Sequence, residues 1–154
     1  MRSFGTIRQF PEARPTRLDH SMKIPTIEDT GRGDDLCFDY YFARFFYDDS
    51  EAVKECCGRF TEEYDRLCRN LDEDPLHQYY EVLSWNELYE MFPIAPSTLC
   101  DEFGYSNAEN DRVRPEFEFE WLTSGPLYER FGRKIFSFGP KRGFEPRSYY
   151  KEGE

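Results

Sequence analysis

The clearest pattern of apolar and polar positions in this sequence is a helical stripe between residues 50 and 71. Its apolar members recur at steps of three and four: Val53, Cys56, Cys57, Phe60, Tyr64, Leu67, Cys68 and Leu71. This spacing places them on one face of an α-helix. The polar residues 48–50 just before the stripe are candidate N-caps. Acidic residues stand four positions before three of the helix arginines, so we expect much of the helix charge to be paired locally.

A second pattern, strict alternation of acidic and aromatic residues from 116 to 121, predicts the clearest β-strand. Its two faces are Glu116, Glu118 and Glu120 on one side and Phe117, Phe119 and Trp121 on the other. Residues 36–43 also alternate, with bulky side chains on both faces, and are predicted to be one continuous strand. Further strands are expected over residues 78–83 and 134–138.

Shorter helices are predicted between these strands. Ser84 and Glu87 have capping-box spacing before a helix that ends near Met91. Ser97 is expected to begin another helix, which stops at Gly104, and a further short helix covers residues 127–131.

Strands and helices mix without regular βαβ alternation, which predicts an α+β fold with a small, mainly antiparallel sheet and two or three helices. Residues 1–33, rich in Pro, Arg and Gly, are expected to form an irregular basic arm with at most one short strand. Residues 34–138 form an acidic, aromatic-rich α+β domain, and residues 139–154 form a basic, irregular tail. The whole chain is expected to be a single domain.

Charge is distributed very unevenly along the 154 residues. Residues 34–120 hold 23 Asp and Glu against 7 Lys and Arg, whereas both flanking segments carry a small net positive charge. The chain as a whole has a net charge of −11. This balance argues against direct binding to nucleic acid or to an anionic membrane, because phosphate groups are bound by Lys and Arg. It favours a basic partner.

The five cysteines give no metal-binding spacing. Cys56 and Cys57 are adjacent and the two histidines, His20 and His77, are far apart, whereas zinc sites use closely spaced pairs. Three of the cysteines lie on the helical stripe, where a thiol packs as a small hydrophobic group. With no apolar stretch after the first basic residues, we expect reduced thiols and a cytoplasmic location, with no metal and no cofactor.

Two groups of acids are the candidate binding residues. Glu116, Glu118 and Glu120 form a row with an i, i+2 spacing of about 6.6 to 6.8 Å, of the same order as successive phosphates on a nucleic-acid strand. Asp72, Glu73 and Asp74 stand at the C-terminal end of the predicted helix, where the helix dipole disfavours anions. Ordinary solvent exposure also explains both groups, the second if it lies beyond the helix.

These features predict a non-enzymatic acidic binding protein that docks on a basic site of another protein, such as a nucleic-acid-binding protein. The most concrete form is a nucleic-acid-mimic inhibitor of the phage or mobile-element anti-defence type, with exposed tyrosines as additional contacts. No catalytic residues are identified. Two alternatives remain open: a small cytosolic enzyme that uses carboxylates, and a nucleic-acid binder that uses the basic residues and aromatics of its C-terminal segment.

Overall fold

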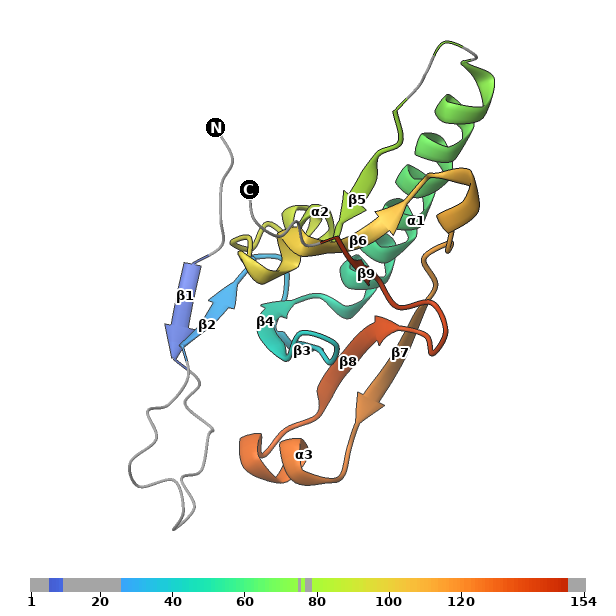
Figure 1. The fold of residues 1–154 in the computed structure, drawn as a ribbon. Coiled ribbons are helices and arrows are strands. Elements are labelled where there is room, and N and C mark those ends of the chain that lie inside the picture. The colour runs from blue at the N-terminus through green and yellow to red at the C-terminus, as the bar shows by residue number, and fades with distance from the viewer. Residues whose placement is uncertain (1–5, 10–25, 75, 77–78, 150–154) are drawn as a thin grey trace.

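The computed structural model describes residues 6–9, 26–74, 76 and 79–149, which form two β-sheets packed with three α-helices (Figure 1). The strands are β1 (Thr6–Gln9), β2 (Thr26–Asp29), β3 (Asp35–Asp39), β4 (Arg44–Asp48), β5 (Val82–Ser84), β6 (Phe103–Ser106), β7 (Phe117–Leu122), β8 (Ile135–Pro140) and β9 (Arg147–Ser148). The helices are α1 (Ser50–Glu73), α2 (Trp85–Met91) and α3 (Pro126–Phe131), with short 3-10 helices η2 (Leu99–Glu102) and η3 (Glu109–Asp111).

The larger sheet has the strand order β1-β2-β4-β3-β8-β7, and the smaller one has the order β5-β6-β9. In the larger sheet β2 pairs with β4 and β3 pairs with β8 in parallel, and its other pairs are antiparallel. The smaller sheet is antiparallel throughout its described strands. The α+β prediction is therefore confirmed, with the refinement that the larger sheet is mixed.

The two faces of the larger sheet bury separate apolar cores. On one face, α1, α2 and the smaller sheet cover a core that includes Cys37, Phe46, Phe136 and Phe138. Residues adjacent to these in the strands point the other way. Their core, under α3, consists of Ile27, Leu36, Tyr47, Phe131 and Ile135. The large sheet is thus covered on one face by α1, α2 and the smaller sheet, and on part of the other face by α3.

Helix α1 forms as its stripe predicted. Asp49 is the N-cap, and its carboxylate accepts the N–H of Ala52 at 3.1 Å. The helix continues to Glu73, two residues beyond the predicted end. The ion pairs differ from the predicted i, i+4 set, because Arg66 binds Glu63, one turn earlier, and Asp65 binds an arginine outside the helix.

The single strand predicted over residues 36–43 is wrong, because the chain turns there and forms the β3–β4 hairpin. The Asp39 carboxylate accepts the N–H groups of Tyr41 and Phe42 at 2.9 and 3.2 Å, which folds the backbone into a turn. Ala43 completes this turn with a positive φ of 55°. Alternating aromatics on both sides of the turn resemble one long strand in the sequence.

Three other predicted elements differ from the structure in their boundaries or in their capping. The helix predicted from Ser97 to Gly104 is only η2, and β6 follows because Tyr105 packs against α1 and donates its hydroxyl to the Phe144 carbonyl at 2.7 Å. The strand predicted over residues 78–83 begins at Val82 among the described residues. Ser84 is the N-cap of α2, but its side chain makes no capping hydrogen bond.

The two segments expected to be irregular also contribute strands. The basic arm of residues 1–33 contains both β1 and β2, where at most one strand was expected, and β2 pairs with β4. The tail of residues 139–154 contains the end of β8 and all of β9. Pairing with a preformed sheet supplies the backbone hydrogen bonds that these Pro- and Gly-rich segments lack on their own.

A fully buried carboxylate, Asp39, holds the hairpin to α2. Besides the two turn N–H groups, it accepts the indole N–H of Trp85 at 2.9 Å and the hydroxyl of Tyr89 at 2.6 Å. Burial raises the pKa of Asp39, and the hydrogen bonds from Tyr89 and Trp85 oppose this shift. Four donors thus compensate the cost of burying the carboxyl group.

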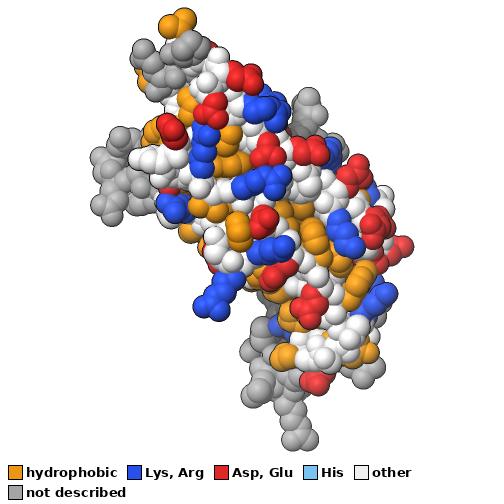
Figure 2. All heavy atoms as spheres, turned by 90° about the vertical axis from the view of Figure 1, so that its right-hand side faces the viewer, with side chains coloured by type: hydrophobic (Ala, Val, Ile, Leu, Met, Phe, Trp, Pro, Cys, Tyr) orange, Lys and Arg blue, Asp and Glu red, His pale blue; other side chains and the backbone are white. Residues whose placement is uncertain are grey.

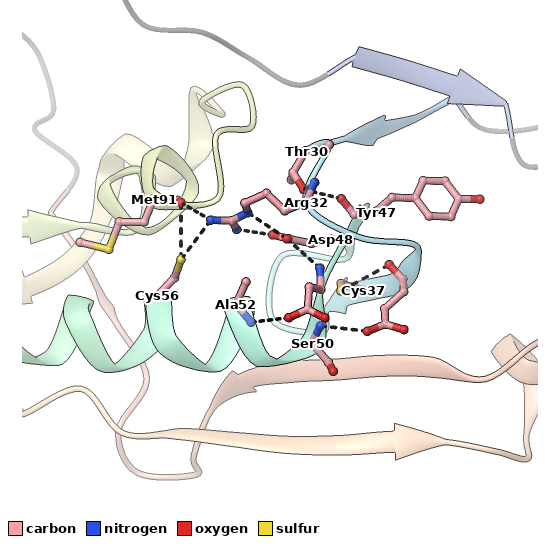
Figure 3. A network of polar contacts seen from close by, with 12 residues as sticks. Thr30, Arg32, Cys37, Tyr47, Asp48, Ser50, Ala52, Cys56 and Met91 are labelled. Atoms are coloured by element: carbon pink, nitrogen blue, oxygen red, sulfur yellow. Dashed lines mark hydrogen bonds and ion pairs between the residues drawn. The ribbon is translucent and has the colours of Figure 1, made fainter.

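A second buried acid, Asp48, is held by Arg32 from the β2–β3 loop (Figure 3). The guanidinium donates from Nε to Asp48 at 2.9 Å and from Nη1 to the Met91 carbonyl at 3.3 Å. The thiol of Cys56 on α1 donates to the same carbonyl at 3.5 Å. One arginine therefore joins the end of β4, α1 and the end of α2.

Replacement of Asp39 with Ala should lower the free energy of unfolding by at least about 3 kcal/mol, because it leaves several buried donors without an acceptor. Tyr89→Phe removes only one donor and should cost about 1.5 to 3 kcal/mol. Urea denaturation followed by tryptophan fluorescence measures both values. Equal losses for the two variants would show that the other three donors contribute nothing.

Candidate functional site

The acidic face of β7 is the part of the predicted site that the fold displays most openly. Strand β7 is the last strand of the larger sheet and packs its aromatic face inward: the ring centroid of Phe117 lies 5.9 Å from that of Phe60 on α1. The predicted strand forms, shifted by one residue, and Glu118 and Glu120 are exposed on the opposite face. Phe119 is also exposed, to 36%. Among the described residues, neither carboxylate has a Lys or Arg at ion-pair distance.

Glu116 stands apart from the other two acids of the row. It precedes β7 and lines a groove between α1 and β7, together with Lys54, Arg114 and Lys141. Asp65 and, more weakly, Glu116 raise the pKa of Arg114. The predicted row of three is therefore divided: Glu116 lies among cations, and the negative face consists of Glu118 and Glu120.

A hollow of about 440 Å³ lies beside this face, lined by Tyr40, Glu118, Phe119, Glu120 and Ser137. The Tyr40 hydroxyl donates to Glu118 at 2.8 Å and also contacts the Pro140 carbonyl. Burial and the adjacent Glu118 carboxylate raise the pKa of Tyr40. Tyr40 thus fixes the position of one acid of the face and leaves a neutral hydroxyl beside it.

The ring of Tyr40 reaches Glu118 by lying directly across Gly139 of β8. A Cβ at position 139 would be 2.5 Å from the Tyr40 ring, which is closer than atoms can approach. The absence of a side chain at Gly139 is therefore required for the position of Tyr40.

The acid cluster at the end of α1 is less available than the sequence indicated. Asp72 and Glu73 lie in the last helical turn, not in the loop beyond it, and Asp74 is the C-cap. Both oxygens of Asp72 accept hydrogen bonds from Arg112, at 2.8 and 3.0 Å, which lower the pKa of Asp72. Asp74 accepts the N–H of Leu76 at 3.0 Å. Glu73 remains exposed.

Exposed aromatic residues follow this cluster. Tyr79 and Tyr80 are 78% and 62% exposed, and Leu76 is 83% exposed. These side chains form a second candidate contact surface at the protruding end of α1 (Figure 1). The exposed tyrosines are therefore not confined to one place, since Tyr40, Tyr41 and Tyr128 are also exposed.

The enzyme alternative gains no support from the buried acids. A raised pKa, as at Asp39, is typical of a catalytic acid. Asp39, however, is fully buried and its oxygens already accept four hydrogen bonds. No group of three or more metal-ligating side chains occurs in the described part of the chain.

The C-terminal aromatics that the nucleic-acid alternative needs are mostly in the core. Phe131, Phe136 and Phe138 are at most 1% exposed, so they are not available for stacking on bases. Arg147 pairs with Asp111, which also accepts the Tyr149 hydroxyl at 2.9 Å. This part of the tail therefore balances acidic charge within the protein. Lys151, another basic residue of this C-terminal segment, lies outside the described residues.

No family model, curated protein or solved structure matches this chain. The described helices include none with the length and apolar character needed to cross a membrane.

Sequence reasoning missed two features of this region: β7 is at the edge of its sheet, and a groove of about 370 Å³ separates it from α1. Figure 2 views this side of the molecule and shows hydrophobic side chains between acidic and basic ones. The order of strands in a sheet depends on pairing between distant segments. The alternation within β7 does not reveal which strands lie beside it.

Gly139→Ala should lower the free energy of unfolding by about 1 to 3 kcal/mol, because the new methyl group displaces the Tyr40 ring. Gly58→Ala is a matched control, for which we expect the opposite change in the free energy of unfolding. A Cβ at this mid-helix position meets nothing within 4 Å, so this change should stabilise the protein by up to about 1 kcal/mol. Thermal and urea denaturation check both changes. A neutral Gly139→Ala variant would contradict the close packing of Tyr40.

Proposed function

We propose that this protein is a non-enzymatic acidic binding protein that docks on a basic site of another protein. The observation that carries the proposal is the exposed pair of Glu118 and Glu120 on the outer face of an edge strand. Most other acids discussed above are buried, as Asp39 and Asp48 are, or bind arginine, as Asp72 does. The acids of β7 are thus available for a partner.

The preferred partner is a protein whose basic site binds nucleic acid. Glu118 and Glu120 project from one strand face about 6.6 to 6.8 Å apart, a spacing of the same order as successive phosphates. Two charges held at a fixed spacing on a strand favour a basic site that binds a polyanion. An inhibitor of the phage or mobile-element anti-defence type, acting as a nucleic-acid mimic in the cytoplasm, is the form of this proposal that we favour.

The test is affinity capture from the native cell at low and raised salt, with the wild-type chain and the Glu118→Lys/Glu120→Lys variant. We expect the wild type to capture a nucleic-acid-binding protein that added DNA or RNA displaces, since both ligands would occupy one site. Raised salt should weaken capture by screening the charges. The variant should lose capture at low salt by charge repulsion.

A matched control carries the same charge change elsewhere. Glu81→Lys/Glu109→Lys alters two exposed acids outside β7 and should still capture the partner. Loss of capture by both double variants would show that only the overall charge matters. Unchanged capture by the β7 variant would show that its acids are simply a solvated strand face.

A further inference from the structure

The outer edge of β7 displays backbone hydrogen-bonding groups as well as acidic side chains. The Phe138 carbonyl accepts the N–H of Tyr40 at 3.1 Å, so the backbone of Phe138 faces β3. Phe119 lies opposite Phe138 in the antiparallel β7–β8 pair. In an antiparallel pair, two opposite residues either exchange backbone hydrogen bonds or both direct their N–H and C=O groups away from each other. The N–H and C=O of Phe119 therefore point away from β8.

A second hydrogen bond gives the same alternation. The N–H of Lys141 donates to the Glu116 carbonyl at 2.9 Å, which makes these two residues a bonded pair. Residues of β7 that are hydrogen-bonded to β8 then recur at every second position, which makes Glu118 and Glu120 the next two. The intervening residues Phe117, Phe119 and Trp121 direct their backbone groups to the outer edge, where β7 has no further strand among the described residues.

The side of this edge that faces α1 has space for side chains. The groove between α1 and β7 contains Gly58 and Thr61 on the helix and Phe117 and Phe119 on the strand, and its charged lining residues include Lys54, Arg114 and Lys141. The apolar part of the groove is the part next to the two phenylalanines. Phe119 is 36% exposed, although it stacks on Phe136. Because Gly58 has no side chain and a Cβ there would meet nothing within 4 Å, the helix leaves this part of the groove open.

The two sides of the edge differ in charge and polarity, which specifies the occupant. A strand added beside β7 would alternate between the Phe117 and Phe119 side and the Glu118 and Glu120 side. Apolar residues suit the first environment, and basic residues suit the second, where opposite charges face each other across strands. A second copy pairing through β7 would bring like charges together, so the acidic row disfavours a homodimer.

We propose that β7 binds a partner by strand addition: an extended segment with alternating apolar and basic residues pairs antiparallel with its outer edge. Antiparallel pairing is the more stable form per residue. This inference rests on the proposed function and adds the binding mode. The backbone groups of Phe117, Phe119 and Trp121 bond the segment, the groove beside α1 receives its apolar side chains, and Glu118 and Glu120 bind its basic ones.

The probe is a capped seven-residue peptide that alternates Lys and Val, titrated at low salt into the full chain labelled with 15N. We expect saturable binding and slower amide hydrogen exchange at Phe119 and Trp121, whose N–H groups become bonded. A peptide N-methylated at its Val residues, whose N–H groups face β7, should bind at least about tenfold more weakly. A peptide N-methylated at its Lys residues, whose N–H groups face away, should bind as the parent does.

The groove is tested by a pair of substitutions at one position. Gly58→Trp should weaken binding of the parent peptide by at least about tenfold, because the indole fills the groove, and Gly58→Ala, whose methyl group is much smaller, should weaken it far less. Circular dichroism checks that both variants fold. Full binding by a folded Gly58→Trp variant would overturn the assignment of the apolar side chains to this groove.

The remaining outcomes separate the binding mode from the function. Equal binding of both N-methylated peptides, without protection of Phe119 and Trp121, would overturn strand addition but leave acidic docking intact. Absence of any peptide binding, together with capture that survives Glu118→Lys/Glu120→Lys, would overturn both. A dimer of the chain alone that protects the β7 amides would make a second copy the occupant and contradict the proposal.

Discussion

The register of β8 is the constraint on which the rest of the structure depends. Phe136 and Phe138 enter the core under α1, so one set of alternate β8 residues is fixed inward. The same register directs the Phe138 carbonyl to β3 and thereby turns the backbone of Phe119 to the outside. It also places Gly139 under Tyr40, which holds Glu118. One buried strand thus determines the position of the exposed edge, which way its acidic side chains point, and which of its backbone groups are free of β8.

The acidic side chains of this protein divide into those that stabilise the fold and those that are exposed to a partner. Asp39 and Asp48 are buried and hold the hairpin, α1 and α2 together through donors from other elements. Asp72 and Asp65 fasten α1 to arginines of the segment before β7. The net charge of −11 therefore overstates the surface that a partner would meet. The acids of β7 combine exposure, a fixed spacing and an adjacent groove that contains Phe117 and Phe119, which makes their face the most specific acidic surface described.

The sequence predicted the parts of the fold that local patterns determine. The α1 stripe with its N-cap and the alternation of β7 are properties of neighbouring residues, and both agree with the structure. The turn after Asp39 was missed although its hydrogen bonds to Tyr41 and Phe42 are local, because the bulky residues on both sides of it alternate as in one strand. The burial of Asp39 could not be predicted, because it depends on Trp85 and Tyr89, 46 and 50 residues away. The edge position of β7 and the Asp72–Arg112 pair likewise depend on contacts between distant segments. The candidate acids were therefore identifiable, but not which of them are paired.

Site-specific photo-crosslinking of the captured complex tests the central claim most directly. Benzoylphenylalanine replaces Thr123, which is exposed directly after β7 and lies outside the groove, or Tyr79, which is 78% exposed at the end of α1. Mass spectrometry then identifies the crosslinked partner peptide. The account predicts crosslinks from position 123 to a segment with alternating basic and apolar residues, and none from position 79. Crosslinks from position 79 alone would place the contact at the exposed tyrosines and contradict the assignment to β7.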